Sequence, residues 1–462
     1  MSKSLDKIDF SKLATHSKPG PRYTSYPTAN EFNASFNAST LEDCLKRSDL
    51  AKPTLPLSIY VHLPFCKSAC YFCGCNVIYT SKEDKKDRYI SYLKKELDLL
   101  KPKLDTSREV VQFHFGGGTP TFFNADQLKE VIDLIKGTFT NFSSKAEISC
   151  EIDPRHFDEK QMRVLKEGGF NRISFGVQDF DSAVQTAVNR IQSLELVKDS
   201  MNLARKYGIN SINFDLIYGL PFQSLRSFQE TLQKVLSLSP DRLAIFNYAH
   251  VPWVKKSMRK IDESALPLPS VKLEILKECI NLLENSGYEM IGMDHFAKKS
   301  DELYLAKEKG ELRRNFQGYT TKGFSQTIGI GITSIGEGAD YYTQNYKDMK
   351  SYEEAIDKGV LPVSIGILLS EEDMLRKAVI MSLMNNLVVD FEVVNKEFGI
   401  DFKSHFASEL KALEDYEKDD LLKIEDSKIV VSPTGGFLIR NIAMVFDTFL
   451  VKNIERKFSK TI

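Results

Sequence analysis

Short apolar runs rich in β-branched residues alternate with amphipathic helical patterns along residues 57–248, and this alternation limits the folds open to the chain. Six strands are predicted, at Leu57–Leu63, Val110–Phe115, Ala146–Ile152, Arg172–Gly176, Ser211–Ile217 and Arg242–Tyr248. Between them, apolar residues at three- and four-residue spacing predict helices at Asp87–Leu100, Ala125–Phe139, Asp158–Glu167, Leu194–Tyr207 and Ser227–Leu238. Repeated strand–helix–strand units indicate parallel pairing through right-handed crossovers. The chain is therefore predicted to be α/β, as a barrel or an open doubly wound sheet.

Polar or glycine-rich residues follow every one of the six predicted strands. In chain order they are Cys66–Cys75, Gly116–Thr121, Glu151–Asp153, Gln178, Asp215 and Asn247–His250. In a (β/α) barrel the carboxyl ends of all strands meet at one mouth, whereas an open sheet offers a single crevice. Six marked ends favour the barrel. Because six units fall short of eight, we expect a partial (β/α)6 barrel with a wide mouth.

The pattern changes on both sides of this region. After Pro252 a helix at Ser270–Asn285 and a strand at Tyr288–Phe296 are predicted. From Glu371 the chain reads as mainly helical, with helices at Met374–Met384, Phe402–Leu413 and Asn441–Phe458 and a hairpin at Leu422–Ile424 and Ile429–Val431. We therefore expect three parts: an N-terminal arm (1–50), a barrel with a substrate-side extension (51–358), and a helical C-terminal domain with a small wing (359–462).

Four of the seven cysteines lie within ten residues, at Cys66, Cys70, Cys73 and Cys75. An odd number of cysteines without a secretory signal argues against a disulfide framework, and clustered thiols in a reducing compartment usually hold a metal. Three thiolates at i, i+4 and i+7 can hold three irons of a [4Fe–4S] cube and leave the fourth iron open. Three alternatives remain: a closed cluster with Cys75 as fourth ligand, a structural zinc site, and reactive thiols. The zinc site lacks the second ligand pair that such sites prefer.

The C-x3-C-x2-C spacing resembles the cluster loop of the radical S-adenosylmethionine superfamily. The longer segment YVHLPFCKSACYFCGC is similar to the oxygen-independent coproporphyrinogen III oxidases, a family of haem biosynthesis. Other segments carry the same resemblance: GPRYTSYPTA (20–29), FGGGTPTF (115–122), SFGVQDF (174–180), DLIYGLP (215–221), FNYAHVP (246–252), GMDHFA (292–297) and RNFQGYTT (314–321). Together they span nearly the whole chain.

The resemblance implies an activity and its cofactors. Members of this family are oxidoreductases that convert two propionate side chains of coproporphyrinogen III to vinyl groups, giving protoporphyrinogen IX. One [4Fe–4S] cluster cleaves S-adenosylmethionine to a 5′-deoxyadenosyl radical that abstracts hydrogen from a propionate, and two S-adenosylmethionine molecules are consumed. No side chain is expected to act as acid or base, because the cofactor carries the chemistry and the protein binds and orients. An unidentified electron donor and acceptor are also implied.

Site residues follow from the resemblance, position by position. The expected cluster ligands are Cys66, Cys70 and Cys73. The expected S-adenosylmethionine contacts are Tyr60, Phe72, Gly117, Gly118, Thr119, Glu151, Gln178, Arg190, Asp215, Ala249 and Ile335. Independently of the family, the glycines at 116–118 let a backbone approach a ligand closely. A carboxylate such as Asp215 within an apolar strand also needs a partner.

A substrate with four carboxylates calls for arginines, whose planar guanidinium groups bind carboxylates through two hydrogen bonds. The candidates are Arg22, Arg313 and Arg314, with Arg440 as a further one. Arg22 is favoured, because its arm has no other evident role and could close the mouth of the barrel.

The overall composition limits the partners. Sixty-two Lys and Arg residues against 63 Asp and Glu give a net charge of −1, which offers no reason to expect nucleic acid or an anionic membrane surface. With 42% hydrophobic residues the chain can bury a sizeable core. No run approaches the ~18–20 apolar residues of a membrane span. We expect a soluble cytoplasmic monomer.

Two other functions stay open at this point. A related branch of the superfamily binds haem and passes it on without decarboxylation, but its members generally lack the fourth cysteine and the PRYTSYPT arm and carry a His-Asn-x-x-Tyr-Trp motif. This chain has Cys75 and the arm, and reads Phe-Asn-Tyr-Ala-His at 246–250. The other alternative is a zinc-stabilised interaction module.

Overall fold

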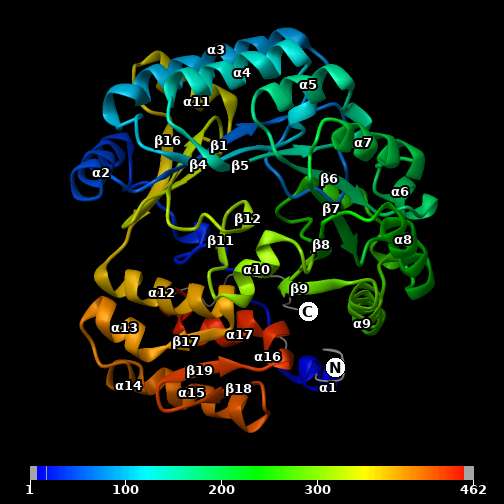
Figure 1. Ribbon diagram of the computed structural model, residues 1–462, viewed down its shortest axis with the longest axis vertical. Helices are drawn as coiled ribbons and strands as arrows, with labels where there is room; N and C mark the ends of the chain where they lie inside the picture. Colours follow the sequence, from blue (N-terminus) through cyan, green and yellow to red (C-terminus); the bar gives the residue numbers. More distant parts are fainter. Residues whose placement is uncertain (1–7, 17, 452–462) are drawn as a thin grey trace.

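Six parallel strands form the centre of a twelve-stranded sheet in the computed structural model, which describes residues 8–16 and 18–451 (Figure 1). They are β1 (Leu57–Leu63), β4 (Val110–Gly117), β5 (Phe142–Ile152), β6 (Arg172–Gln178), β7 (Ser211–Tyr218) and β8 (Arg242–Asn247). The six lie side by side in chain order, and each pairs with the next in parallel. The predicted α/β class and its six parallel strands are therefore confirmed.

Further strands extend the sheet at both edges. Beyond β1 come β13 (Gln326–Ile330), which is parallel to β1, and then the antiparallel strands β14 (Ile335–Glu337), β15 (Tyr341–Asn345) and β16 (Val363–Leu368). Beyond β8 lie β10 (His295–Lys298) and β9 (Tyr288–Gly292), both antiparallel to their neighbours. The single strand predicted over Tyr288–Phe296 is thus wrong. Met293 adopts the left-handed backbone region (φ 45°), and the chain reverses there into a hairpin.

Helices connect the parallel strands and cover the outer face of the sheet (Figure 1). They are α3 (Glu83–Leu100), α4 (Ala125–Thr138), α5 (Glu159–Glu167), α6 (Ser182–Ala187), α7 (Leu194–Lys206) and α8 (Leu225–Leu238). Reciprocal side-chain to backbone hydrogen bonds fix the starts of α4, α5 and α8, at Asn124, Asp158 and Ser224. Their apolar faces pack on the sheet in one continuous core.

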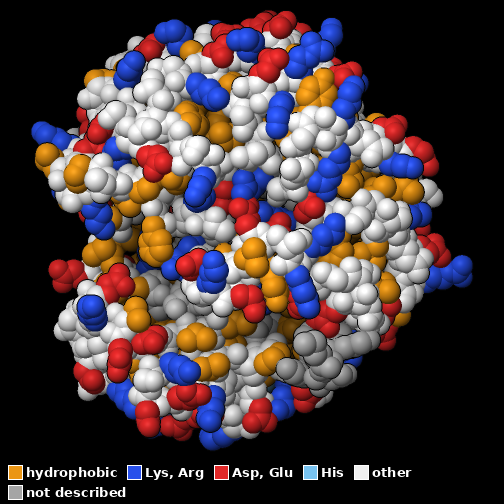
Figure 2. Space-filling view, viewed as in Figure 1, with side chains coloured by type: hydrophobic (Ala, Val, Ile, Leu, Met, Phe, Trp, Pro, Cys, Tyr) orange, Lys and Arg blue, Asp and Glu red, His pale blue; other side chains and the backbone are white. Residues whose placement is uncertain are grey.

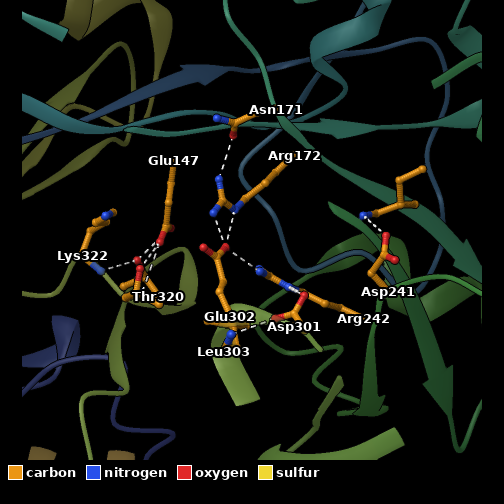
Figure 3. Close-up of polar contacts among 12 residues, drawn as sticks. Glu147, Asn171, Arg172, Asp241, Arg242, Asp301, Glu302, Leu303, Thr320 and Lys322 are labelled. Atoms are coloured by element: carbon orange, nitrogen blue, oxygen red, sulfur yellow. Dashed lines mark hydrogen bonds and ion pairs between the residues drawn. The ribbon is translucent and has the colours of Figure 1, made fainter. Parts of the chain in front are cut away.

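Partly buried ion pairs close the amino-terminal end of the barrel. Arg172 and Arg242 are the first residues of β6 and β8, and both bind the carboxylate of Glu302, at the start of α10 (Glu302–Glu308), as Figure 3 shows. Arg242 also donates to Asp301 at 2.8 Å. Since the two arginines lie at the strand starts, α10 covers the end opposite to the strands' carboxyl ends.

A hairpin fills the same end from inside. It consists of β11 (Arg313–Asn315) and β12 (Gly318–Thr320), which pair in antiparallel fashion. The buried carboxylate of Glu147 on β5 accepts hydrogen bonds from the hydroxyls of Thr320 at 2.9 Å and Thr321 at 2.7 Å (Figure 3). The RNFQGYTT segment (314–321) therefore fills the interior of the barrel near its amino-terminal end.

The C-terminal part is mainly helical, as predicted. Its elements are α12 (Glu371–Asn386), α13 (Phe391–Phe398), α14 (Phe402–His405), α15 (Ala407–Lys418), α16 (Pro433–Phe437), α17 (Ile439–Ala443) and α18 (Thr448–Val451). A small antiparallel sheet orders β17 (Val388–Asp390), β19 (Lys428–Val431) and β18 (Leu422–Ile424). β16, inside the predicted C-terminal range, still belongs to the large sheet. We call residues 371–451 the helical module.

Two predicted helices of this module are interrupted. The helix expected over Phe402–Leu413 breaks at Phe406, whose side chain is fully buried against Phe402 and Phe446. The helix expected over Asn441–Phe458 ends at Ala443, and residues 452–458 lie outside the described residues. After the break, the carboxylate of Asp447 accepts the backbone N–H of Phe449 at 2.9 Å.

Remaining helices lie outside the barrel repeat: α1 (Phe10–His16), α2 (Ala38–Ala51), α9 (Pro269–Asn285) and α11 (Met349–Asp357). Two short parallel strands, β2 (Phe65–Cys66) and β3 (Ile78–Tyr79), lie at the two ends of the segment that contains the clustered cysteines. We call this segment, Cys66–Cys75, the cysteine loop. Within the described ranges, no helix combines the length and apolar character needed to cross a membrane. On the face shown in Figure 2, acidic and basic side chains are interspersed.

The N-terminal arm contributes to the core of the helical module. Leu13, Tyr23 and Tyr26 are at most 1% exposed and belong to the same apolar cluster as Leu383 and Phe402. Figure 1 shows α1 next to α16, although they lie at opposite ends of the sequence. The hydroxyl of Tyr23 donates to Asp447 at 2.7 Å. The arm therefore stabilises this module in addition to any role at the barrel.

Truncating Leu13 to Ala tests this packing. The substitution removes a fully buried side chain from the core of the helical module, which should lower the free energy of unfolding by about 2–5 kcal/mol. Thr15→Ala, on the exposed side of the same helix, should change it by less than about 0.5 kcal/mol. Urea unfolding followed by circular dichroism measures both. Equal effects would contradict the packing described here.

Candidate active site

A cavity of about 550 Å³ opens at the carboxyl ends of the six parallel strands. Each of the six strands contributes to its wall, either from its carboxyl-terminal half or from the loop that follows, and Arg22 of the arm completes the lining. Thirteen of the residues predicted from the sequence lie there: Arg22, Cys66, Cys70, Phe72, Cys73, Gly117, Gly118, Thr119, Glu151, Gln178, Arg190, Asp215 and Ala249. Segments far apart in sequence thus meet at one place, as expected for a barrel.

Two of the three predicted cluster cysteines lie beside neutral hydrogen-bonding groups. The Cys66 Sγ atom is 3.3 Å from the hydroxyl of Thr119, in the glycine-rich loop after β4. The backbone N–H of Cys75 donates to the Cys73 Sγ atom at 3.4 Å. Hydrogen bonds of this kind stabilise thiolates that ligate metal.

Cys70 differs because two cations approach its sulfur. Guanidinium nitrogens of Arg155 and Arg190 lie 3.7 and 3.6 Å from Cys70 Sγ. Asp153 accepts hydrogen bonds from both arginines, at 2.7 and 2.9 Å, and so holds them together. Burial raises the pKa of Asp153, but the two arginines outweigh it and lower that pKa to about 2. Arg155 was missed in the sequence, where only its position just after the end of β5 marks it.

The cysteines fit a [4Fe–4S] cluster better than a single ion. In the part of the chain that the structure describes, no three Cys, His, Asp or Glu side chains are placed to bind one metal ion. In a cube each thiolate binds a different iron, so the sulfurs stand apart around a shared space. Cys66, Cys70 and Cys73 do so around one cavity. Burial raises the pKa of the Cys66 thiol to about 12, so metal binding there displaces a proton.

The glycine-rich loop is required by the packing of the protein itself. Gly117 has φ +118°, which side chains other than glycine rarely adopt, and a Cβ there would lie 2.8 Å from the ring of His62. A Cβ on Gly118 would lie 2.6 Å from the carbonyl oxygen of Pro64. The sequence suggested space for a ligand as the reason for these glycines. The structure adds close contact between the loop and β1 as an independent reason.

Glu151 is held as a carboxylate at the cavity wall. His114 lies 3.5 Å from one of its oxygens, and the backbone N–H of Gly117 donates to the other at 3.3 Å. Burial raises its pKa, but His114 and the Gly117 N–H outweigh this and keep the pKa below its ordinary value. Tyr60 is not part of the cavity wall, and its ring stacks on His114 at 5.9 Å between centroids. A negative charge here suits an ammonium or sulfonium group.

Asp215 lies on β7 and lines the cavity. The hydroxyl of Ser174 and the side-chain amide of Asn213 each donate to its carboxylate at 2.8 Å. Of the two partners expected from the sequence, a buried arginine or a ligand, the arginine is not among the hydrogen-bond donors, which are both neutral. Burial raises the pKa of Asp215 to about 6.

Arg22 reaches the cavity from the arm. Its guanidinium group is paired with Asp294 and lies 5.5 Å from the centre of the Phe246 ring. Arg314 donates to the carbonyl oxygen of Arg22 at 3.2 Å, and Arg440 donates to that of Pro21 at 2.8 Å. Arg314 and Arg440, both candidates for substrate binding from the sequence, therefore hold the backbone of the arm. This backbone places the side chain of Arg22 at the cavity.

Two other predicted residues lie away from the cavity wall. Arg313 stacks on Phe324, with 4.7 Å to the ring centre, and donates to the carbonyl oxygen of Leu312 at 2.9 Å. Ile335 is the first residue of β14. Asp294 and Phe246, which contact Arg22, were not singled out from the sequence, although both lie in segments that carry the family resemblance.

Replacing Asp215 with Asn should stabilise the cofactor-free protein in a pH-dependent way. The pKa of Asp215 rises from 3.8 to about 6 on folding, so the folded state binds this proton more tightly and stability falls as the pH rises from about 4 to about 6. Asn carries no such cost. We expect a gain on the order of 2–3 kcal/mol at pH 7.5 and little at pH 4. Thermal unfolding at both pH values measures it, and an equal gain at both would contradict the raised pKa.

Comparison with known proteins agrees with this geometry. Residues 60–235 match the model of the radical SAM superfamily, and residues 369–438 match the HemN C-terminal domain. Proteins named oxygen-independent coproporphyrinogen III oxidase are similar over 99% of this chain and 100% of their own length, with 61% identity in Helicobacter pylori (strain J99) and 44% in Escherichia coli (strain K12).

A solved structure gives the same result for the fold. Coproporphyrinogen III oxidase (HemN) from Escherichia coli, described as a radical SAM enzyme, superposes with a TM-score of 0.91 at 43% identity. The match covers 96% of this chain and 100% of the other. The sequence, the cysteine-lined cavity and these similarities together place the chain in the oxygen-independent coproporphyrinogen III oxidase family of radical S-adenosylmethionine enzymes.

Proposed function

We propose that this protein catalyses the oxygen-independent oxidative decarboxylation of two propionate side chains of coproporphyrinogen III, giving protoporphyrinogen IX in haem biosynthesis. The observation that carries the proposal is the shared cavity, where Cys66, Cys70 and Cys73 lie together with Arg22 of the arm. A site for radical generation and a cation for a propionate are thus within one space. The full-length similarity to enzymes named for this reaction supports it.

The cofactors are a [4Fe–4S] cluster and S-adenosylmethionine. When bound, they supply the one-electron chemistry that removes a hydrogen atom from a propionate. The chain's own residues bind and orient: Cys66, Cys70 and Cys73 hold the cluster. The residues that bind S-adenosylmethionine line the cavity: Phe72, Gly117, Gly118, Thr119, Glu151, Gln178, Arg190, Asp215 and Ala249. Tyr60 and Ile335, which the family resemblance also implied, do not line it and are left out of this set. The negative charge that His114 and Gly117 maintain on Glu151 favours a cationic part of that cofactor.

The substrate end of the site carries surplus positive charge. Arg22, Arg314 and Arg440 lie near one carboxylate, that of Asp294. Burial, with a smaller contribution from the positive charges of Arg22 and Arg314, lowers the pKa of Arg440 to about 10. A propionate relieves this imbalance, because it adds a negative charge where three guanidinium groups share one. Arg22 is the residue that binds the propionate, because the Arg22 side chain is 40% exposed and lines the cavity.

The reaction needs both an electron donor and an electron acceptor. Loss of a hydrogen atom and carbon dioxide from an ionised propionate leaves one surplus electron, while the cleavage of each S-adenosylmethionine consumes one.

We place the protein in the cytoplasm as a monomer. All seven cysteines are free thiols, which is typical of a reducing compartment.

An anaerobic assay tests the proposed function. Reconstituted protein, coproporphyrinogen III, S-adenosylmethionine and dithionite should yield protoporphyrinogen IX, identified by chromatography after oxidation, with two equivalents of 5′-deoxyadenosine per product. Cys70→Ser should lose iron and all activity, because a cluster ligand is missing. Cys75→Ser should keep its iron. Stable haem binding without product would instead favour the haem-transfer branch of the superfamily.

Arg22→Ala tests the substrate contact. Loss of one charged hydrogen-bonding group costs about 1.5–3 kcal/mol, so kcat/KM for coproporphyrinogen III should fall ~10–150-fold. Cleavage of S-adenosylmethionine without substrate should be nearly unchanged. Arg313→Ala is the matched control, because Arg313 does not line the cavity. If Arg313→Ala lowers kcat/KM as much as Arg22→Ala does, the assignment of Arg22 is wrong.

A further inference from the structure

A basic segment lies on the surface next to the cysteine loop. Residues 253–260 read Trp-Val-Lys-Lys-Ser-Met-Arg-Lys and contain four cations and no acid. We call this segment the basic loop. Trp253 and Val254 are 57% and 65% exposed, and Lys256, Arg259 and Lys260 are exposed as well. Because the whole chain has a net charge of −1, this local positive charge does not follow from the overall composition.

The basic loop has a fixed shape. Met258 is 3% exposed and packs in an apolar cluster beneath the loop, and its sulfur accepts the backbone N–H of Val251 at 3.4 Å. Arg259 donates through Nε to the carbonyl oxygen of Pro252 at 3.2 Å. With Met258 as the buried anchor, the neighbouring cations face the solvent.

Two contacts join the basic loop to the cluster-binding segment. Lys255 Nζ donates to the carbonyl oxygen of Cys75 at 3.0 Å, and Lys260 Nζ lies 4.9 Å from the ring centre of Tyr71. The N–H of the same Cys75 donates to the sulfur of Cys73 at 3.4 Å. Only residue 75 therefore separates a surface lysine from a proposed cluster ligand.

We propose that the basic loop is the docking site of an acidic one-electron carrier protein that reduces the cluster. This inference rests on the proposed function, since it assumes a cluster at Cys66, Cys70 and Cys73. Cations at the rim attract and orient an acidic partner. The exposed Trp253 at the start of the same segment supplies the apolar contact that protein interfaces favour. In the complex one electron leaves the reduced carrier and enters the cluster, with no bond made or broken.

The positions of the cations in the basic loop suit contact with a protein partner more than contact with the substrate. Lys256 and Arg259 are exposed and do not line the cavity, whereas Arg22 does. Along the sequence no acidic residue occurs over 242–261, and the next ones are Asp262 and Glu263, of which Glu263 is paired with His250. The basic loop therefore presents mainly positive charge to a partner that contacts it.

Charge reversal with two different reductants tests the proposal. In Lys256→Glu/Arg259→Glu, activity driven by a reduced, acidic plant-type ferredoxin should fall at least tenfold, while activity driven by dithionite should stay unchanged, because this small reductant needs no docking site. Lys396→Glu/Lys411→Glu makes the same change of charge at exposed positions of α13 and α15 and should leave both activities unchanged.

The fluorescence of Trp253 gives a second measurement, because it is the only tryptophan in the chain. Titration of the anaerobic holoenzyme with oxidised, tryptophan-free ferredoxin should change its emission. The Kd should increase at least tenfold in the charge-reversed variant and also increase with salt.

Each other outcome has a definite meaning. Equal loss with both reductants would overturn the proposal, since the loop would then serve the cluster or the substrate. Unchanged ferredoxin-driven activity and an unchanged Kd would place the carrier elsewhere and overturn it as well. A wild-type enzyme without dithionite-driven product would contradict the proposed function instead, and the fluorescence titration would still decide whether the carrier docks at the basic loop.

Discussion

Parallel pairing of neighbouring strands is the constraint on which the site depends. Each crossover returns the chain to the same end of the sheet, so the carboxyl ends of six strands share one edge. Cys66 and Ala249 line one cavity for this reason, although most of the barrel separates them in sequence. The opposite end has the reverse role. There Arg172, Arg242 and Glu302 form ion pairs that close the barrel and leave a single open side.

The sequence predicts what depends on local periodicity and on strand ends. The strand Leu57–Leu63 agrees with the structure at both ends, because its apolar run is bounded by polar and proline-containing segments. The strand expected over Tyr288–Phe296 was wrong, although Gly292 and Asp294 on either side of Met293 are residues that favour turns. Cavity residues such as Glu151 and Asp215 could be predicted because they lie near the carboxyl ends of predicted strands.

What the sequence does not contain is the identity of contacts between distant segments. An arginine in the sequence predicts a positive charge but does not identify the group that it contacts. Arg314 and Arg440 were candidates for binding carboxylates of the substrate, and in the structure they donate to carbonyl oxygens of the arm. Arg155 could not be predicted for the same reason. Its contact with Cys70 joins the segment just after β5 to the loop after β1, which is remote in sequence. The pairing of Arg22 with Asp294 also joins remote segments.

The packing of the arm into the helical module has a consequence for protein synthesis. Leu13 and Tyr23 leave the ribosome first, but the residues that surround them, such as Leu383 and Phe446, emerge near the end of translation. Until then Arg314 and Arg440, which hold the backbone next to Arg22, cannot both be in place, so the part of the cavity wall that Arg22 forms is incomplete. A nascent chain can thus complete its barrel well before it becomes competent to bind a tetrapyrrole.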